Sequence, residues 1–290
     1  MKNFIEKFTS LAYWLRTMTE RVIKQPLQVQ QLHAEIERLR ERPRYQDRKC
    51  LVPFGHKVYS QNDEDGIIRE IFNRIGVTNR TFVEFGVGNG LENNTLALLF
   101  DGWNGLWIEG SCRYVKKIRE GFSTVVDSGQ LAVTQSFITT ENINGLISRN
   151  IAESEIDLLS IDIDGNDFHI FKSIDCVRPR VVVIEYNAKF VPPVMFCMQY
   201  NKSHAWASDD CFSASLKYLE VNFAAFGYSL VGCSVTGVNA FFVRNDLVED
   251  NFLEPFTAEH HFEPARYFLA GIPSGHRPSY RTLETSLPRR

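Results

Sequence analysis

Two short apolar runs, each followed at once by a polar turn, constrain the fold of this chain more than any other feature. Residues 82–90 read FVEFGVGNG and residues 156–167 read IDLLSIDIDGND. The apolar part of each block is typical of a buried strand, and the first turn holds three glycines whereas the second holds three carboxylates. Ligands of open parallel sheets bind beyond the carboxyl ends of the strands. The two blocks therefore predict a nucleotide-like cofactor beside an acidic reaction site.

Strand and helix patterns alternate from Tyr59 to Glu185, and a hairpin pattern with a turn at Thr236-Gly237 follows. This order predicts right-handed βαβ units, a mainly parallel sheet and an antiparallel end. The predicted strands cover residues 81–85, 105–109, 156–161, 180–185, 228–233 and 239–244, with a β-rich stretch at 124–138. The predicted helices cover residues 67–75, which Ser60–Asp63 would cap, and residues 114–120, 141–148, 168–174 and 214–226.

The segment 4–39 carries apolar residues at alternating steps of four and three, interrupted at Gln25 and Pro26. This heptad spacing predicts a coiled coil that Pro26 kinks, and through these helices a homo-oligomer. Two alternatives stay open. The segment either packs as amphipathic helices on its own domain or lies on a membrane surface. The heptad positions are Phe4, Phe8, Leu11, Leu15, Met18, Val22, Val29, Leu32, Ile36 and Leu39.

Three parts of the chain follow from these patterns. Residues 1–45 are the predicted oligomerisation segment, residues 46–250 the predicted α/β domain, and residues 251–290 a tail that forms either a lid or an ordered extension.

Charge and cysteine usage narrow the classes of partner and compartment. The net charge is −3, although the first 49 residues are basic, so the rest of the chain is acidic. An acidic body argues against nucleic acid as a partner. The six scattered cysteines are typical of free thiols in a reducing cytoplasm. We find neither an apolar run long enough to span a membrane nor a signal peptide, so we expect a cytoplasmic protein, with peripheral contact at the inner membrane face as the alternative.

The first turn carries the residues expected to bind the cofactor. Gly86, Gly88 and Gly90 allow a sharp turn and a close approach of the backbone to a ligand. Glu84 ends the first predicted strand, and Glu109 ends the second, where an acid can accept hydrogen bonds from both ribose hydroxyls. Tight turns also need glycine for purely structural reasons, and the two acids are what favour a nucleoside site.

The second turn carries the residues expected to perform chemistry. Alternation along a strand would put Asp162 and Asp164 on one side, with Glu185 at the end of the next strand. Carboxylates this close must share a proton or a cation, and oxygen ligands suit Mg²⁺ or Ca²⁺. The alternative is that one acid caps the following helix. His204, in a loop after a strand, is a candidate general base.

Five motifs of this chain resemble those of the FkbM-type S-adenosylmethionine-dependent methyltransferases, and the resemblance covers about residues 57–245. The resemblance implies a class I methyltransferase-like (Rossmann-like) α/β fold: a seven-stranded sheet with an antiparallel last strand. It also implies methyl transfer to hydroxyls, mostly of sugars and polyketide-type products. The family's D-x-E-G-x-E appears here as Asp162-x-Asp164-Gly165-x-Asp167. The motifs are Ser60-Gln61…Asp65-Gly66, Val83–Gly86, Gly102-Trp103…Ile108-Glu109, Ile161–Asp167 and Val183–Asn187.

We therefore predict an O-methyltransferase that uses S-adenosylmethionine, with or without Mg²⁺, on a sugar or glycan acceptor. The alternatives are a nucleotide- or NAD-dependent sugar-modifying enzyme and an inactive, oligomeric methyltransferase-like scaffold. The predicted cofactor-binding residues are Gln61, Glu84, Gly86, Gly88, Asn94, Glu109 and Asp162. The predicted metal ligands are Asp162, Asp164 and Glu185, and the predicted catalytic residues are Asp164, Asp167 and His204.

Overall fold

The computed structural model describes residues 30, 32, 34–35, 37–39, 41–207 and 209–269. The chain divides into two compact units after Arg48. In the first unit the described residues include the short helix α2 (Pro43–Gln46). Most of the predicted coiled coil at 4–39 lies outside the described residues, so oligomerisation through it stays a prediction. The unit that begins at Lys49 contains the sheet and the candidate site, and all that follows concerns this unit.

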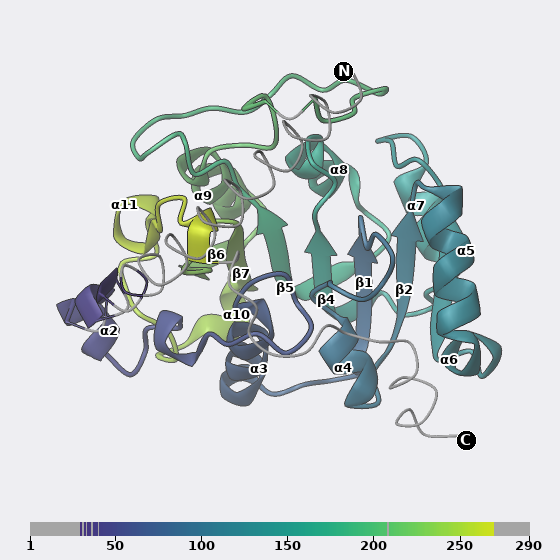
Figure 1. Cartoon of the computed structure of the whole chain (residues 1–290), viewed down its shortest axis with the longest axis horizontal. Coiled ribbons are helices and arrows are strands. Elements are labelled where there is room, and N and C mark those ends of the chain that lie inside the picture. Colours follow the sequence, from purple (N-terminus) through teal and green to yellow (C-terminus); the bar gives the residue numbers. More distant parts are fainter. Residues whose placement is uncertain are drawn as a thin grey trace, which may run out of the picture. The chain divides into compact units, whose positions relative to one another are not determined.

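A seven-stranded sheet forms the centre of this unit, with the strand order β3-β2-β1-β4-β5-β7-β6. All neighbouring strands from β3 to β5 are parallel, whereas β7 runs antiparallel to both β5 and β6. Figure 1 shows the parallel strands ending at one common edge of the sheet. The predicted class I methyltransferase-like fold is thereby confirmed. The strands are β1 (Thr81–Phe85), β2 (Asn104–Glu109), β3 (Leu131–Gln135), β4 (Glu155–Ile161), β5 (Arg178–Glu185), β6 (Tyr228–Cys233) and β7 (Asn239–Arg244).

Helices cover both faces of this sheet because side chains alternate along each strand. Val83 of β1 packs in the core on the side of α7, α8 and α9, whereas its neighbour Phe82 packs on the side of α3, α4 and α6. The helices are α3 (Glu64–Ile75), α4 (Leu96–Phe100), α5 (Cys112–Gly121), α6 (Ser123–Asp127), α7 (Ile143–Ser148), α8 (Asp167–Ser173), α9 (Leu216–Ala225), α10 (Asn245–Val248) and α11 (Ala258–His261), with 3₁₀ turns at Val52–Phe54 and Tyr267–Leu269.

The start of α3 shows how local chemistry fixes an element beside the site. As predicted, the Ser60 hydroxyl serves this helix end, since it accepts a hydrogen bond from the Asp65 backbone N–H at 3.2 Å. The Asp65 side chain in turn accepts hydrogen bonds from the backbone of the segment before the helix. Its Oδ2 accepts the backbone N–H groups of Val58, Tyr59 and Ser60, each at 2.7 Å. These three hydrogen bonds fold the segment before α3 against the helix.

One expectation about secondary structure differs from the structure. The stretch 124–138 is only partly β, because α6 takes up Ser123–Asp127 and β3 begins at Leu131. The β-branched run at 124–126 reads as a strand, but the chain continues from α5 through Phe122 into another helical turn. The tail is ordered as far as it is described, with α11 and a 3₁₀ turn at Tyr267–Leu269. Within the described part of the chain, no helix has the length and apolarity needed to cross a bilayer.

Candidate functional site

A cleft of about 1330 Å³ opens beyond the carboxyl ends of the parallel strands. Its walls come from the segments that follow β1, β2, β3, β4 and β5, together with the start of β7. The strand order reverses between β1 and β4, where helices leave the sheet on opposite faces and ligands bind in such folds. The cleft thus brings the glycine-rich turn and the acidic turn into one cavity.

The three glycines of the first turn have left-handed φ values of +74°, +55° and +78°, but each serves a different contact. A Cβ on Gly86 would lie 1.7 Å from the carbonyl oxygen of Asp162, so this glycine lets the two turns touch. A Cβ on Gly90 would meet Trp107 and Phe122 at 2.9 Å, in the core. A Cβ on Gly88 would have no atom of the described residues within 4 Å, apart from Gly88 itself and its two chain neighbours. Gly88 therefore leaves room for a ligand.

Two predicted cofactor acids lie in the cleft wall and organise the turns around them. The Glu84 carboxylate accepts the backbone N–H groups of Asn94 at 2.8 Å and Thr95 at 3.2 Å, together with the Thr95 hydroxyl. Glu109 accepts the Gly88 N–H and the Ser111 N–H, each at 2.8 Å. Both acids therefore hold the loops that line the cofactor half of the cleft.

Glu84 should make the stability of the unliganded protein fall as the pH rises. Burial raises the pKa of Glu84 to about 7, against the hydrogen bonds from Thr95, Asn94 and Ser160. A carboxyl with a raised folded-state pKa stabilises the fold below its unfolded value of about 4.5, and this contribution is lost as the pH rises through about 7. The loss is on the order of 3 kcal/mol.

Urea unfolding at pH 5 and pH 8 measures this difference, and Glu84→Gln provides the matched uncharged variant. Glu84→Gln should show a smaller drop in unfolding free energy between the two pH values. An equal drop in both proteins would assign the pH dependence to other carboxyls.

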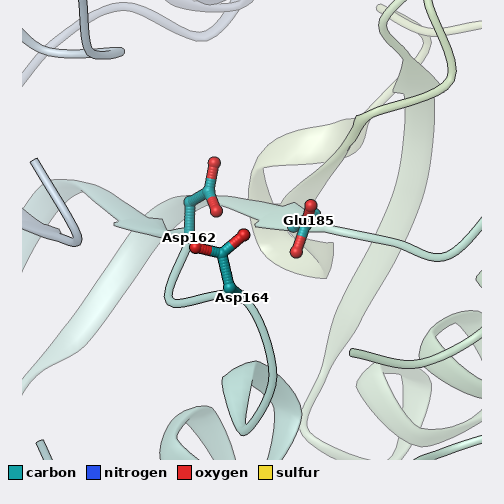
Figure 2. Close-up of side chains that lie close together, drawn as sticks. All are labelled: Asp162, Asp164 and Glu185. Atoms are coloured by element: carbon teal, nitrogen blue, oxygen red, sulfur yellow. The ribbon is translucent and has the colours of Figure 1, made fainter. Parts of the chain in front are cut away.

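The acidic turn brings together the three predicted metal ligands. Asp162, Asp164 and Glu185 each offer a carboxylate oxygen, and these oxygens lie within 4.8 Å of one another (Figure 2). The expectation that alternation along a strand puts Asp162 and Asp164 on one side was wrong, because β4 ends at Ile161 and both aspartates follow it in a turn. Asp164 has a φ of +54°, in the left-handed region. The turn, and not strand alternation, aims its carboxylate at Glu185.

Burial and mutual repulsion raise the pKa values of this group. Burial raises the pKa of Asp162 well above its usual range, and the charges of Asp167 and Asp164 raise it further. Burial likewise raises the pKa of Glu185, followed by the charge of Asp162. Glu185 Oε2 is buried and has no hydrogen-bond partner among the described residues. Such a group requires a proton or a bound cation.

Asp167 serves the turn itself. Its Oδ1 accepts the Ile163 N–H and its Oδ2 accepts the Gly165 N–H, each at 2.9 Å. Asp167 is fully buried at the start of α8 and is not among the described residues that line the cleft. Asp167 therefore has a structural role in the turn that precedes α8, and α8 has no side-chain cap hydrogen bond of the kind that the capping alternative expected.

His204 reaches the acidic turn from its own loop. Its Nε2 lies 3.1 Å from the carbonyl oxygen of Asp164, and a Cβ on Gly165 would lie 2.2 Å from its Cδ2 atom. A carbonyl oxygen can only accept, so Nε2 carries the proton and Nδ1 of the neutral ring is the acceptor. His204 also lines the cleft. The structure thus brings together His204, Asp162, Asp164 and Glu185.

Gln61 and Asn94, the other predicted cofactor residues, also line the cleft. The Gln61 carbonyl accepts a hydrogen bond from Lys57 Nζ at 3.2 Å. The Asn94 side-chain amide donates to the Ser160 hydroxyl at 3.0 Å.

Two further asparagines of the cleft wall were missed by sequence reasoning. Asn93 Nδ2 and Asn239 Oδ1 are buried, and neither has a partner within the described part of the chain. Asn93 Oδ1 caps α4 through the backbone N–H groups of Thr95 and Leu96. Asn239 Nδ2 donates to Glu64 Oε1 at 2.9 Å. Two residues of the cleft wall thus carry a buried donor and a buried acceptor without a partner among the described residues, which the sequence alone did not signal.

Comparison with known proteins supplies independent information. Residues 63–202 match the family model described as the methyltransferase FkbM domain. No curated protein matches the chain significantly. Among solved structures, a Klebsiella pneumoniae protein proposed to be an O-methyltransferase is similar, with a TM-score of 0.43 and 14% identity, over 65% of this chain and 82% of that one. The METTL16 methyltransferase domain is similar with a TM-score of 0.42 and 14% identity, over 66% of this chain and 70% of that one. TrmK from M. capricolum, in complex with S-adenosylhomocysteine, is similar with a TM-score of 0.37 and 11% identity, over 61% of this chain and 65% of that one.

Proposed function

Since residues 63–202 match the family model of the methyltransferase FkbM domain, we propose that this protein transfers a methyl group from S-adenosylmethionine to a hydroxyl group of a sugar or glycan. Dependence on S-adenosylmethionine follows from the family match, and the NAD- or nucleotide-dependent alternative is not favoured. The observation that carries the proposal is the single cleft in which a glycine turn open to a ligand faces a cluster of acids and a histidine.

The cofactor half fits S-adenosylmethionine. The space at Gly88 admits a ligand close to the backbone, and Asn93 Nδ2 is a buried donor that lacks a partner in the described structure. Glu109, at the end of β2, is the acid expected at the ribose hydroxyls. Bound there, the cofactor supplies an already activated methyl group. The protein then has to orient the acceptor hydroxyl and exclude water.

A divalent cation fits the acidic half. Asp162, Asp164 and Glu185 offer hard oxygen ligands, and the buried Glu185 Oε2 lacks a partner among the residues described. Mg²⁺ held there would stabilise negative charge on a hydroxyl oxygen. We expect activity to require added Mg²⁺ and to fall in Asp164→Asn, whereas full activity of the parent in excess EDTA would exclude the metal and leave Asp164 as a charged partner of His204.

His204 is the proposed general base. A sugar hydroxyl is barely acidic at neutral pH, so a group must accept its proton as the methyl is transferred. The hydrogen bond of Nε2 to the Asp164 carbonyl fixes the ring and leaves Nδ1 to accept that proton. Asp167 is then a positioning residue, because it holds the turn from which Asp164 projects.

Binding of S-adenosylhomocysteine tests the cofactor assignment. Glu109→Ala should weaken binding about 10- to 100-fold, since hydrogen bonds to a charged group contribute about 1.5–3 kcal/mol. Calorimetry measures this, with Glu120→Ala, an exposed acid on α5, as the control that should bind like the parent. Equal binding by Glu109→Ala would move the ribose site elsewhere. Transfer of labelled methyl to neutral glycosides tests the reaction, and binding without transfer to any acceptor would favour the scaffold alternative.

A further inference from the structure

The segment that follows β7 returns to the cleft and is held there by buried polar contacts. The Arg266 guanidinium pairs with Glu263 at 2.6 Å and donates to the Val235 carbonyl at 2.8 Å. The side chains of this ion pair are only 4% and 1% exposed. The Arg266 backbone N–H also donates to the Thr236 carbonyl at 2.8 Å. These contacts fasten the segment to the turn between β6 and β7.

A second set of contacts holds the same segment at the end of β5, which carries Glu185. The Tyr186 hydroxyl, next in sequence to Glu185, donates to the Glu263 carbonyl at 2.6 Å. A Cβ on Gly237 would lie 2.6 Å from the Pro264 carbonyl oxygen, so the two backbones touch. The segment is therefore fixed against the end of β5 as well as against the β6–β7 turn.

Tyr267 follows this anchor directly and faces the cleft. Its side chain lines the cavity although the residue is 52% exposed. Burial raises the pKa of Tyr267, the charge of Glu185 raises it further, and the charge of Lys189 opposes them. Its hydroxyl therefore lies within the electrostatic reach of both Glu185 and Lys189.

A second exposed aromatic side chain of the cleft lies in the segment that carries the partner of Lys189. Lys189 Nζ pairs with Asp210 at 2.8 Å, and the Trp206 indole N–H donates to the Asp209 carbonyl at 2.7 Å. Trp206 is 48% exposed, lines the same cleft, and lies two residues after His204. Two large aromatic side chains, Tyr267 and Trp206, thus remain partly exposed in the cleft that also contains the acids.

We infer that Tyr267 and Trp206 form the acceptor-binding walls of the cleft and hold the ring of an uncharged sugar beside His204 and the acids. The inference rests on the proposed function. An aromatic face suits a pyranose ring, whose C–H groups present an apolar face while its hydroxyls point outward. The Asp209 carboxylate, which lines the cleft outside the cation cluster, can accept hydrogen bonds from hydroxyls and disfavours phosphate or carboxylate groups there.

Steady-state kinetics with a panel of neutral methyl glycosides and labelled S-adenosylmethionine tests this in the full chain. Tyr267→Ala and Trp206→Ala should each raise KM for the glycoside about 10-fold, with a small change in kcat and unchanged binding of S-adenosylhomocysteine. Tyr267→Phe, which keeps the ring, should retain the parent KM. Phe226→Ala, an aromatic residue that is 43% exposed and is not among the described residues lining the cleft, is the matched control and should leave KM for the glycoside unchanged.

The outcomes distinguish a failure of the aromatic walls from a failure of the proposed function. If the parent methylates a glycoside and both alanine variants keep its KM, the aromatic walls are excluded while the proposed function stands. If the parent binds S-adenosylhomocysteine but methylates no glycoside, the sugar acceptor itself is wrong and the walls with it. Thermal unfolding of each variant guards against misfolding, and the exposure of both side chains predicts unchanged midpoints.

Discussion

Replacing His204 by glutamine is expected to lower kcat by about 10²- to 10⁴-fold, the range that a general base contributes. The reason is geometric, since Nε2 is tied to the Asp164 carbonyl and only Nδ1 can accept the substrate proton. Binding of S-adenosylhomocysteine should stay unchanged, because His204 lies against the acidic turn and not at the glycine turn. Single-turnover rates with a neutral glycoside measure the effect.

His169→Gln is the matched control for this variant. His169 lies in α8, where its Nε2 contacts the Met198 carbonyl at 2.8 Å, and it is not one of the described cleft residues. Its replacement should leave kcat within about 2-fold of the parent, the usual small effect of a change away from the site. A His204→Gln variant as fast as this control would assign proton removal to another group, with Asp164 the nearest candidate.

Asp157→Ala is expected to lower the free energy of unfolding by about 3–5 kcal/mol, the cost of removing one partner of a buried ion pair. Asp157 is fully buried in β4 and pairs with Arg180 of β5 at 2.7 Å. It also accepts the backbone N–H groups of Thr78, Asn79 and Arg80, so it fixes the turn that enters β1. The variant leaves these donors and the guanidinium without their shared acceptor.

Urea unfolding checks this, with Glu155→Ala as a control from the same strand. The Glu155 carboxylate is 41% exposed and pairs with Arg244 at 2.6 Å, so its loss should cost no more than about 1 kcal/mol. Although burial raises the pKa of Asp157, the hydrogen bonds from Arg180 and the backbone outweigh it and lower the pKa. This stabilisation is therefore lost only in strong acid, and a large difference between parent and variant should persist from pH 5 to 8.

The sequence predicted most of the sheet because its strands carry strong, local signals. Strands 81–85 and 239–244 have the predicted bounds, and alternation with helices led directly to the parallel order. The glycine turn and the acidic turn were placed correctly at one end of the sheet, since each follows an apolar run. Helix α6 was missed because its short run of Thr and Val carries a strand signal that the preceding helix overrides.

What the sequence did not reveal depends on contacts between distant segments. Asp157 sits in an apolar strand, and its importance follows from Thr78 and Arg180, which lie in other elements. Asp167 shares its motif with Asp164, and only the turn geometry separates the structural acid from the exposed one. Tyr267 stands in a segment without periodicity, so nothing local indicated that it reaches the cleft.

The left-handed backbone conformation of Asp164 affects which substitutions the protein tolerates at this position. Glycine fits a φ of +54° without a side-chain clash, and asparagine tolerates it well, so an aspartate at this position sacrifices some folding free energy. It does so among other acids whose repulsion adds to the cost. With the role proposed for Asp164, stability and activity would oppose each other at this turn, so Asp164→Gly should unfold at a higher temperature than the parent and lose activity.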